Sequence, residues 1–170
     1  SAFGRSQLHP SSCIDNSEAM VAERTCFIHI GTHKTGTTSI QWFIRENRTT
    51  LARSGVLIPR SGGSEDDAGH HDLTQELLGV TDGSGPRGGL AQFADEIKAS
   101  SEPHACISCK NFTLLARNAD ALRRMRDAVV AAGFKPVVLV CLRPQGSFVV
   151  SIYAQIVTDG WGKSFATYLK

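Results

Sequence analysis

The sequence has no long apolar run, no large excess of one charge and few cysteines, and each of these scarcities excludes a class of protein. No apolar segment reaches the roughly 20 residues that a membrane-spanning helix needs, and residues 1–23 lack the apolar core of a secretion signal. A formal net charge of +2 gives no indication of nucleic-acid binding. With 41% hydrophobic residues among 170, the chain is expected to form one globular domain without a membrane segment.

The five cysteines are irregularly spaced, which is not typical of a disulfide framework. The odd count favours free thiols in a reducing compartment, so a cytoplasmic protein is expected. Cys106 and Cys109 form one C-x-x-C pair. A structural zinc ion needs two further ligands, and no second pair of cysteines or histidines has a suitable spacing. We therefore expect no metal site. The cysteines are Cys13, Cys26, Cys106, Cys109 and Cys141.

Short apolar runs alternate with helical patterns along the chain. This alternation predicts an α/β fold with three layers, α/β/α, and a central parallel sheet. The run at 137–142 is the most apolar, and it is expected to be a central strand buried on both faces. Trp42 and Phe43 are expected in the core. The expected strands are 26–30, 56–58, 105–108 and 137–142, and the expected helical regions are 37–54, 70–78, 90–100, 112–132 with a break near Asn118, 145–158, and a last helix capped by Ser164.

The polar, aperiodic residues 1–24 are expected to form an N-terminal tail, and residues 25–170 the α/β domain. Parallel sheets bind ligands at the carboxyl ends of their strands. Three segments follow such ends: residues 31–38, residues 108–111 and the segment that begins at Arg143. We expect these three segments to meet in one crevice.

The stretch from Phe27 to Ile40 predicts a strand, a tight turn and the start of a helix. Unpaired N–H groups at a helix N-terminus favour an anion, and Gly31 and Gly36 let a ligand approach the backbone closely. Lys34 adds a positive charge to this turn. Further donors come from the hydroxyl groups of Thr35, Thr37, Thr38 and Ser39. The turn is therefore predicted to bind an anionic group.

The turn has the glycine spacing of a Walker A loop, G-x-x-x-x-G-K-[ST], but not its lysine. Thr37 stands where the lysine is expected, and the lysine has moved to position 34. The strand at 137–142 ends in Arg143 rather than in the aspartate that would hold Mg²⁺. These differences favour a P-loop NTPase-like fold that works with cations of the protein and needs no metal.

Thr32 to Thr38 resembles the 5′-phosphosulfate-binding loop of sulfotransferases that use 3′-phosphoadenosine 5′-phosphosulfate (PAPS), where K-[ST]-G-T-[TS] follows an apolar strand. In that family a later strand ends in arginine and a serine follows on the next helix. Arg143 and Ser151 match this second motif in order and spacing. The resemblance covers about residues 25–170, and bacterial carbohydrate-type members are closest.

The resemblance implies a transferase that moves a sulfuryl group from PAPS to a hydroxyl or amine of a carbohydrate or small molecule. Residues 35–39 would hold the 5′-phosphosulfate, and Arg143 and Ser151 the 3′-phosphate. Lys34 would neutralise charge on the bridging oxygen during transfer, which leaves adenosine 3′,5′-bisphosphate as the product. No nucleic acid, no metal and no defined oligomer is implied.

The general base for the acceptor does not follow from the motifs. Many relatives have His or Glu after the third strand, and bacterial relatives often read S-S-E-x-F where this chain has Lys110 within Ser-Cys-Lys-Asn-Phe. Lys110 is one candidate, and His70 or His71 is favoured because a neutral imidazole accepts a proton near neutral pH. His29 and His33 are expected to be packing and loop residues.

Two other functions stay open from the sequence. The first is a P-loop nucleotide kinase, against which the position of Lys34 counts. The second is a non-catalytic nucleotide-binding module, which Lys110 in place of an acid favours. Sulfotransferases usually continue beyond the helix that carries the second motif, so the domain is expected to lack its C-terminal part.

Overall fold

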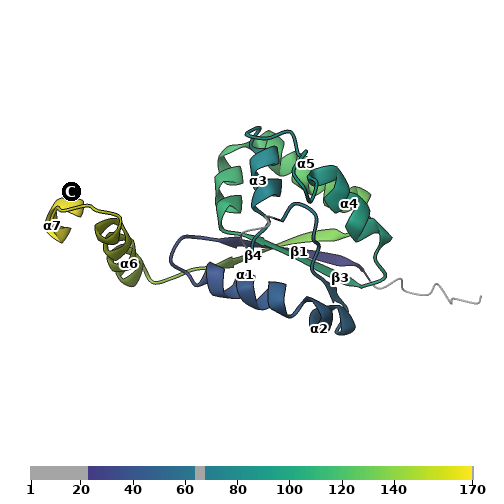
Figure 1. The fold of residues 1–170 in the computed structure, drawn as a ribbon, viewed down its shortest axis with the longest axis horizontal. Coiled ribbons are helices and arrows are strands. Elements are labelled where there is room, and N and C mark those ends of the chain that lie inside the picture. Colours follow the sequence, from purple (N-terminus) through teal and green to yellow (C-terminus); the bar gives the residue numbers. More distant parts are fainter. Residues whose placement is uncertain (1–22, 64–67, 170) are drawn as a thin grey trace, which may run out of the picture.

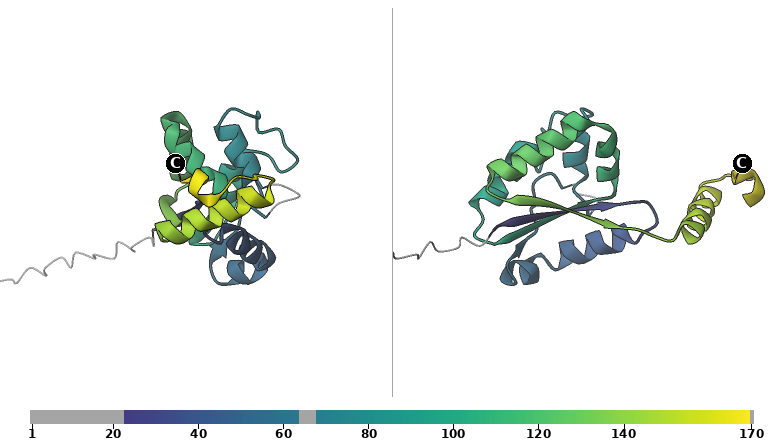
Figure 2. Two further views of the ribbon diagram at one scale, coloured as in Figure 1. Left: turned by 90° about the vertical axis from the view of Figure 1, so that its left-hand side faces the viewer. Right: turned by 180° about the vertical axis from the view of Figure 1, so that it is seen from behind.

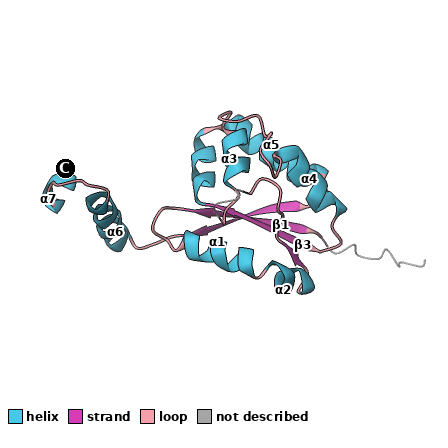
Figure 3. Ribbon diagram, in the orientation of Figure 1, coloured by secondary structure: helices cyan, strands magenta, loops and turns pink. Residues whose placement is uncertain are grey.

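The computed structural model describes residues 23–63 and 68–169. Its centre is a four-stranded parallel sheet with the strand order β2-β3-β1-β4 (Figures 1 and 3). In the shared register, Ile28 of β1 pairs with Ile107 of β3 and with Val138 of β4. The predicted α/β fold with a central parallel sheet is therefore confirmed. The strands are β1 (Thr25–Gly31), β2 (Val56–Leu57), β3 (His104–Cys109) and β4 (Lys135–Cys141).

Helices cover both faces of the sheet, as a three-layer arrangement requires. One face carries α1 (Thr37–Glu46) and α2 (Arg48–Arg53), and the other carries three helices (Figures 1 and 2). These three are α3 (His71–Leu77), α4 (Leu90–Ala99) and α5 (Ala119–Ala131). The 3₁₀ helix η1 (Lys110–Arg117) joins β3 to α5. Beyond the carboxyl end of β4, α6 (Gln145–Thr158) and α7 (Phe165–Tyr168) stand away from the sheet.

The hydrophobic core lies between the sheet and the layer of α3, α4 and α5. Alternate strand residues face this core, because successive side chains of a strand point to opposite faces. Its fully buried members from the strands are Cys26, Ala105, Ile107 and Cys109, and those from the helices include Leu73, Phe93, Ile97 and Val129.

The register of α1 differs from the one expected. Trp42 and Phe43 are exposed, so their predicted place in the core was wrong. The helix instead buries Thr37, Gln41 and Ile44, which share one face at a spacing of four and three residues. A polar side chain, Gln41, occupies the core-facing position that the apolar pattern assigned to its neighbours.

The strand β4 is an edge strand, so its predicted place in the centre of the sheet was wrong. Among the described residues, β1 is its sole neighbour, and Val138, Leu139 and Val140 are exposed. An uninterrupted apolar run predicts burial on both faces. It does not reveal which strand lies at the edge, because that depends on the partners that pair with the strand.

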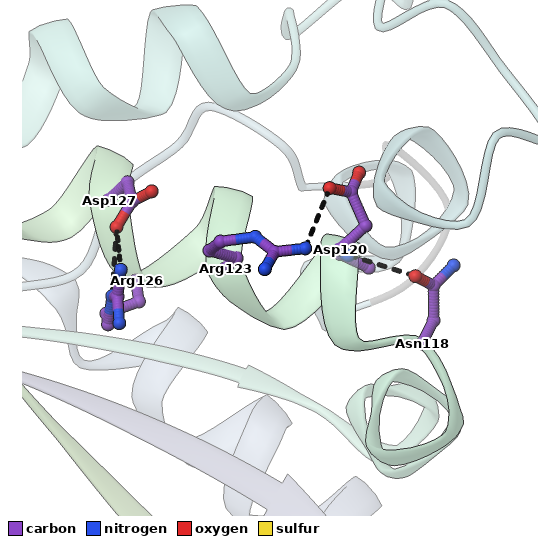
Figure 4. Close-up of polar contacts among 6 residues, drawn as sticks. Asn118, Asp120, Arg123, Arg126 and Asp127 are labelled. Carbon is purple, nitrogen blue, oxygen red and sulfur yellow. Dashed lines mark hydrogen bonds and ion pairs between the residues drawn. The ribbon is translucent and has the colours of Figure 1, made fainter.

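Caps and ion pairs define α5 and confirm the predicted break near Asn118. The Asn118 side chain accepts a hydrogen bond from the N–H of Ala121 at 3.0 Å, which is the geometry of an N-cap. Arg123 pairs with Asp120, and Arg126 pairs with Asp127, on the exposed side of the helix (Figure 4). The predicted cap of the last helix is confirmed as well, since the Ser164 hydroxyl accepts from the N–H of Thr167.

Residues 1–22 of the expected tail lie outside the described part of the chain, and so does Cys13. Arg24 is anchored to the domain: its guanidinium stacks on the Phe134 ring at 3.9 Å and donates to the carbonyl of Ser100 at 2.7 Å. The four described cysteines are free thiols. None of the described helices has the length and apolar character to span a membrane.

Candidate functional site

The loop between β1 and α1 has a backbone shape that few side chains permit. A Cβ atom at Gly31 would lie 1.9 Å from the Thr37 hydroxyl, so the strand end and the helix start touch there. Gly36 has a φ of 82° and Lys34 a φ of 64°, both in the left-handed region. Lys34 is the one non-glycine residue with positive φ in the described ranges. The loop is thus wound tightly around the N-terminus of α1.

Some hydroxyl groups of the loop form hydrogen bonds within it, and others are exposed to solvent. The Thr35 hydroxyl donates to the carbonyl of Thr32 at 2.7 Å and lies 3.2 Å from the Thr37 hydroxyl. Thr37 is buried, whereas Thr38 and Ser39 are exposed in the first turn of α1. The first N–H groups of this ten-residue helix have no acceptors within the helix, so they favour an anion at this end.

A cavity of about 530 Å³ opens over the loop. One wall is the loop with the first turn of α1, and another is α6, although about 115 residues separate them in sequence. The lining also includes Lys110, the first residue after β3, so the three predicted strand-end segments meet here. The lining residues are Thr32, His33, Lys34, Gly36, Thr37, Thr38, Lys110, Ile152, Gln155 and Ile156.

The side chain and the backbone carbonyl of Lys34 each form a hydrogen bond with the segment that follows β4. Its Nζ atom donates to Oε1 of Gln155 on α6 at 2.6 Å. Its carbonyl accepts from Nη1 of Arg143 at 3.1 Å. Gln155 in turn donates through Nε2 to the Asp159 carboxylate at 2.8 Å. The loop cation and the strand-end arginine, which are far apart in sequence, therefore belong to one cluster.

Arg143 contacts a different serine from the one expected. Its Nε atom donates to the Ser147 hydroxyl at 3.2 Å, one helical turn before Ser151. A second cavity of about 290 Å³ brings Arg143 together with Lys34, Thr35 and Gly36. Ser151 is half-buried on α6 and lines neither cavity. The structure therefore brings Arg143 to the loop, with Ser147 rather than Ser151 as its partner.

His70 is a buried, hydrogen-bonded side chain that does not line the cavity. The N–H of Ser108 donates to its Nδ1 at 3.2 Å, so the proton of the neutral ring lies on Nε2 and is donated to the carbonyl of Pro59 at 3.1 Å. Burial lowers the pKa of His70 to about 4. The ring thus ties the segment before α3 to the ends of β2 and β3.

His71 lies beside the end of β3 and not in the cavity. Its Nδ1 atom is 3.4 Å from the Sγ atom of Cys109, which also accepts a hydrogen bond from the Thr74 hydroxyl at 3.2 Å. Cys109 is fully buried. Of the three candidates for a general base, the structure places Lys110 in the cavity and the two histidines outside it.

His29 has the packing role that was expected. It is buried on β1, and its Nδ1 atom lies 2.7 Å from the Ser108 hydroxyl on β3. Burial lowers its pKa. Gln41 of α1 donates to the Ser108 carbonyl at 3.4 Å, so polar contacts link α1, β1 and β3 beneath the loop.

His33 and Gln155 are the cavity residues that sequence reasoning missed. His33 lies in the loop as expected, between the two motif glycines, and it also lines the cavity. Gln155 follows Ser151 by one helical turn, so its place near the second motif was a usable signal. Nothing in the sequence could have shown that Gln155 holds Lys34, because that contact depends on the direction of α6.

The comparison with protein-family models gave no match, and neither did searches of curated proteins and of solved structures. Within the described ranges, no three His, Cys, Asp or Glu side chains are grouped as ligands of a metal ion.

Proposed function

We propose that this chain is a PAPS-dependent sulfotransferase with a P-loop NTPase-like fold, which transfers a sulfuryl group to a hydroxyl or amine of a carbohydrate or small molecule. The observation that carries the proposal is the hydrogen bond from Arg143 to the carbonyl of Lys34. It supports the proposal because it brings Arg143, the arginine of the second motif, to the backbone of Lys34 in the first, although the sequence separates the two residues by 109 positions.

The loop and the first turn of α1 suit the 5′-phosphosulfate. The N–H groups of residues 35–39, with the exposed hydroxyls of Thr38 and Ser39, would donate hydrogen bonds to its oxygens. Lys34 would neutralise the negative charge that develops on the bridging oxygen, and Arg143 would bind the 3′-phosphate, with Ser151 one turn beyond its present partner. The bound donor supplies the sulfuryl group, and the protein supplies position and charge.

The acceptor must lose a proton as its oxygen or nitrogen bonds to sulfur. Of the described residues that line the cavity, His33 is the one with an imidazole, and we assign it the role of general base. Lys110 lies in the same cavity, where its ammonium group would orient an acceptor that carries a negative charge. His70 and His71 are then structural residues that pack beside the end of β3, outside the cavity.

The nucleotide kinase is the weaker alternative. Among the described residues that line the cavity there is no Asp or Glu, whereas Mg²⁺ bound with a nucleotide is usually held through carboxylates. A non-catalytic nucleotide-binding module has one specific observation in its favour: His70 and His71, the two histidines that the sequence favours as the base, lie outside the cavity.

Two measurements test the proposal. Isothermal titration should give tighter binding of adenosine 3′,5′-bisphosphate than of ATP, with no requirement for Mg²⁺. Labelled PAPS and a panel of hydroxyl and amine acceptors should then give a sulfated product. Mg²⁺-dependent binding of ATP alone would overturn the proposal in favour of a kinase, and bisphosphate binding without turnover of any acceptor would favour the binding module.

Substitution of Lys34 separates its charge from its backbone role. Lys34→Ala and Lys34→Gly both remove the ammonium group, and glycine also fits the left-handed backbone without strain. Both should lower transfer by at least about 100-fold while the protein stays folded. Lys98→Ala, which removes an exposed lysine from α4, is the matched control and should leave transfer unchanged. Near-normal transfer by both Lys34 variants would contradict the assigned role.

A further inference from the structure

The cavity over the loop is lined by basic side chains and, among the described residues, by no Asp or Glu. His33, Lys34 and Lys110 all line it. Lys110 is half-buried, and within the described ranges nothing accepts a hydrogen bond from its ammonium group. Lys34, in contrast, already donates to Gln155. A cleft whose charges have one sign concentrates ligands of the opposite sign, so the wall at Lys110 favours an anion.

The strand order places Lys110 and Arg143 on opposite sides of the loop. Lys110 is the first residue after β3, and Arg143 lies two residues beyond the end of β4. β1, which leads into the loop, lies between these two strands (Figure 1). The register brings Ile30 of β1 level with Cys109 of β3 and with Val140 of β4. Because neighbouring strands lie about 4.8 Å apart, roughly 10 Å separates the ends of β3 and β4.

A sulfuryl transfer needs its two reactants on opposite sides of the sulfur atom. The attacking and leaving oxygens lie roughly in line, as in phosphoryl transfer. The acceptor oxygen bonds to sulfur, and its proton passes to His33. The bond from sulfur to the bridging oxygen breaks, and its electron pair stays on the 5′-phosphate of adenosine 3′,5′-bisphosphate. With the 3′-phosphate at Arg143, the nucleotide lies on the β4 side, so the acceptor enters on the β3 side, where Lys110 lies.

The part of the cavity wall that α6 contributes is largely apolar. Ile152 and Ile156 are four residues apart on one helix face, and both are half-buried. Both line the same cavity as Lys110. In ligand sites an apolar wall packs against the ring of the ligand, while a few polar groups fix its orientation. The cavity therefore offers an ammonium group together with an apolar surface.

We propose that the acceptor is an acid: it carries a carboxylate near the hydroxyl or amine that receives the sulfuryl group. Lys110 binds this carboxylate, and Ile152 and Ile156 pack against the ring of the acceptor. The inference rests on the proposed function and narrows it, since that function also admits neutral acceptors. A hydrogen bond from an ammonium group to a carboxylate is about twice as strong as one between neutral groups. Lys110 thus selects the acceptor by its charge.

Matched pairs of acceptors test the effect of charge. p-Nitrophenyl glucuronide and its uronamide have the same ring and hydroxyl groups, and 4-hydroxybenzoate and 4-hydroxybenzamide form an aromatic pair. With labelled PAPS, kcat/KM should be about 10- to 100-fold higher for at least one acid than for its amide. Lys110→Ala should abolish this preference through a higher KM for the acid. Lys110→Arg should keep the preference, and Lys110→Glu should reverse it. Lys98→Ala, at an exposed lysine of α4, is the control and should change neither acceptor.

Binding without turnover gives a second measurement. Isothermal titration of each acid and amide into the free protein, and into protein saturated with adenosine 3′,5′-bisphosphate, should show the same preference for an acid. Lys110→Ala should abolish this preference and leave the dissociation constant of the bisphosphate unchanged.

The outcomes separate the inference from the proposed function. A wild-type protein that binds neither acid better than its amide would overturn the inference. A Lys110→Ala variant that transfers equally less to acid and amide would overturn it too, because Lys110 would then contact the donor. A protein that binds no bisphosphate would overturn the proposed function, and the titrations of the free protein would still decide whether Lys110 selects an acid.

Discussion

The ammonium group of Lys34 donates a hydrogen bond to the side-chain carbonyl of Gln155, across 121 positions of sequence, at 2.6 Å. The loop cation is thus held by a neutral amide, which is a weaker partner than a carboxylate or a phosphate. An anion that enters the loop has to displace a neutral group only. Gln155 therefore keeps Lys34 ordered at the mouth of the cavity without cancelling its charge.

The charge of the residue at position 155 should control anion binding. Gln155→Glu would pair Lys34 with a carboxylate, and we expect the dissociation constant of adenosine 3′,5′-bisphosphate to rise by about tenfold or more. Gln155→Ala removes the competing acceptor and should bind at least as tightly as wild type. Isothermal titration of the three proteins measures the difference, and equal affinities would contradict the role given to Gln155.

Gly31 should tolerate no side chain. The Cβ atom of Gly31→Ala would lie 1.9 Å from the Thr37 hydroxyl, so the start of α1 must move. We expect a loss of about 1–3 kcal/mol in the free energy of unfolding, together with weaker bisphosphate binding. Gly146→Ala is the matched control, because nothing lies within 4 Å of the added Cβ in α6. Urea unfolding should show that this control is neutral or slightly stabilised; equal effects at both glycines would contradict the close contact.

Arg143 should discriminate between nucleotides by their 3′-phosphate. Arg143→Ala removes a charged hydrogen-bond donor, and we expect bisphosphate binding to weaken by about 10- to 100-fold. The affinity for a nucleotide without the 3′-phosphate should fall much less. For that nucleotide the variant loses only the hydrogen bond by which Arg143 orders the Lys34 carbonyl. Arg53→Ala, at an exposed arginine of α2, is the control. Equal losses for both nucleotides would show that Arg143 shapes the loop and does not bind the 3′-phosphate.

The buried histidines should make the fold sensitive to mild acid. Burial lowers the pKa of His70 from 6.5 to about 4, so between these values the unfolded chain binds a proton that the folded chain excludes. The free energy of unfolding should therefore fall as the pH decreases below about 6.5, by up to about 1.4 kcal/mol per pH unit for this group. Above that pH, His70 should contribute no pH dependence to the free energy of unfolding, because it is neutral in both the folded and the unfolded chain. The lowered pKa of His29 adds a change of the same sign.

His70→Gln separates this effect from the titration of carboxylates. The variant lacks the imidazole, so its free energy of unfolding should fall less steeply than that of wild type between about pH 6.5 and pH 5. Urea unfolding at several pH values gives both slopes. Identical slopes would mean that His70 is protonated in the folded protein, in conflict with its contacts to Ser108 and Pro59.

Local patterns were sufficient to predict the strand, loop and helix around Lys34. Gly31 and Gly36 determine the turn because only glycine fits the close contact at one and the left-handed backbone at the other. The alternation of strands and helices was enough to predict the parallel sheet. These features depend on neighbours in sequence, and so the sequence contains the information for them.

The rest depends on partners that are distant in sequence. The position of β4 at the edge could not follow from its apolar run, since burial on both faces and exposure at an edge have the same residue pattern. Gln41 took the core position in place of Trp42 and Phe43 because its amide reaches the carbonyl of Ser108. The contacts of Arg143 with Ser147 and of Gln155 with Lys34 depend on the direction that α6 takes after Pro144.

The strand order has a consequence for the timing of folding. Of the described strands, β1 is synthesised first, yet its two neighbours in the sheet are β3, which begins at His104, and β4, which begins at Lys135. Protein synthesis adds about 5–20 residues per second, so the loop sequence leaves the ribosome seconds before the strands that support it. The proposed anion site is therefore encoded early and assembled late, and we expect bisphosphate added to a ribosome-bound chain to stabilise it only after Cys141 has emerged.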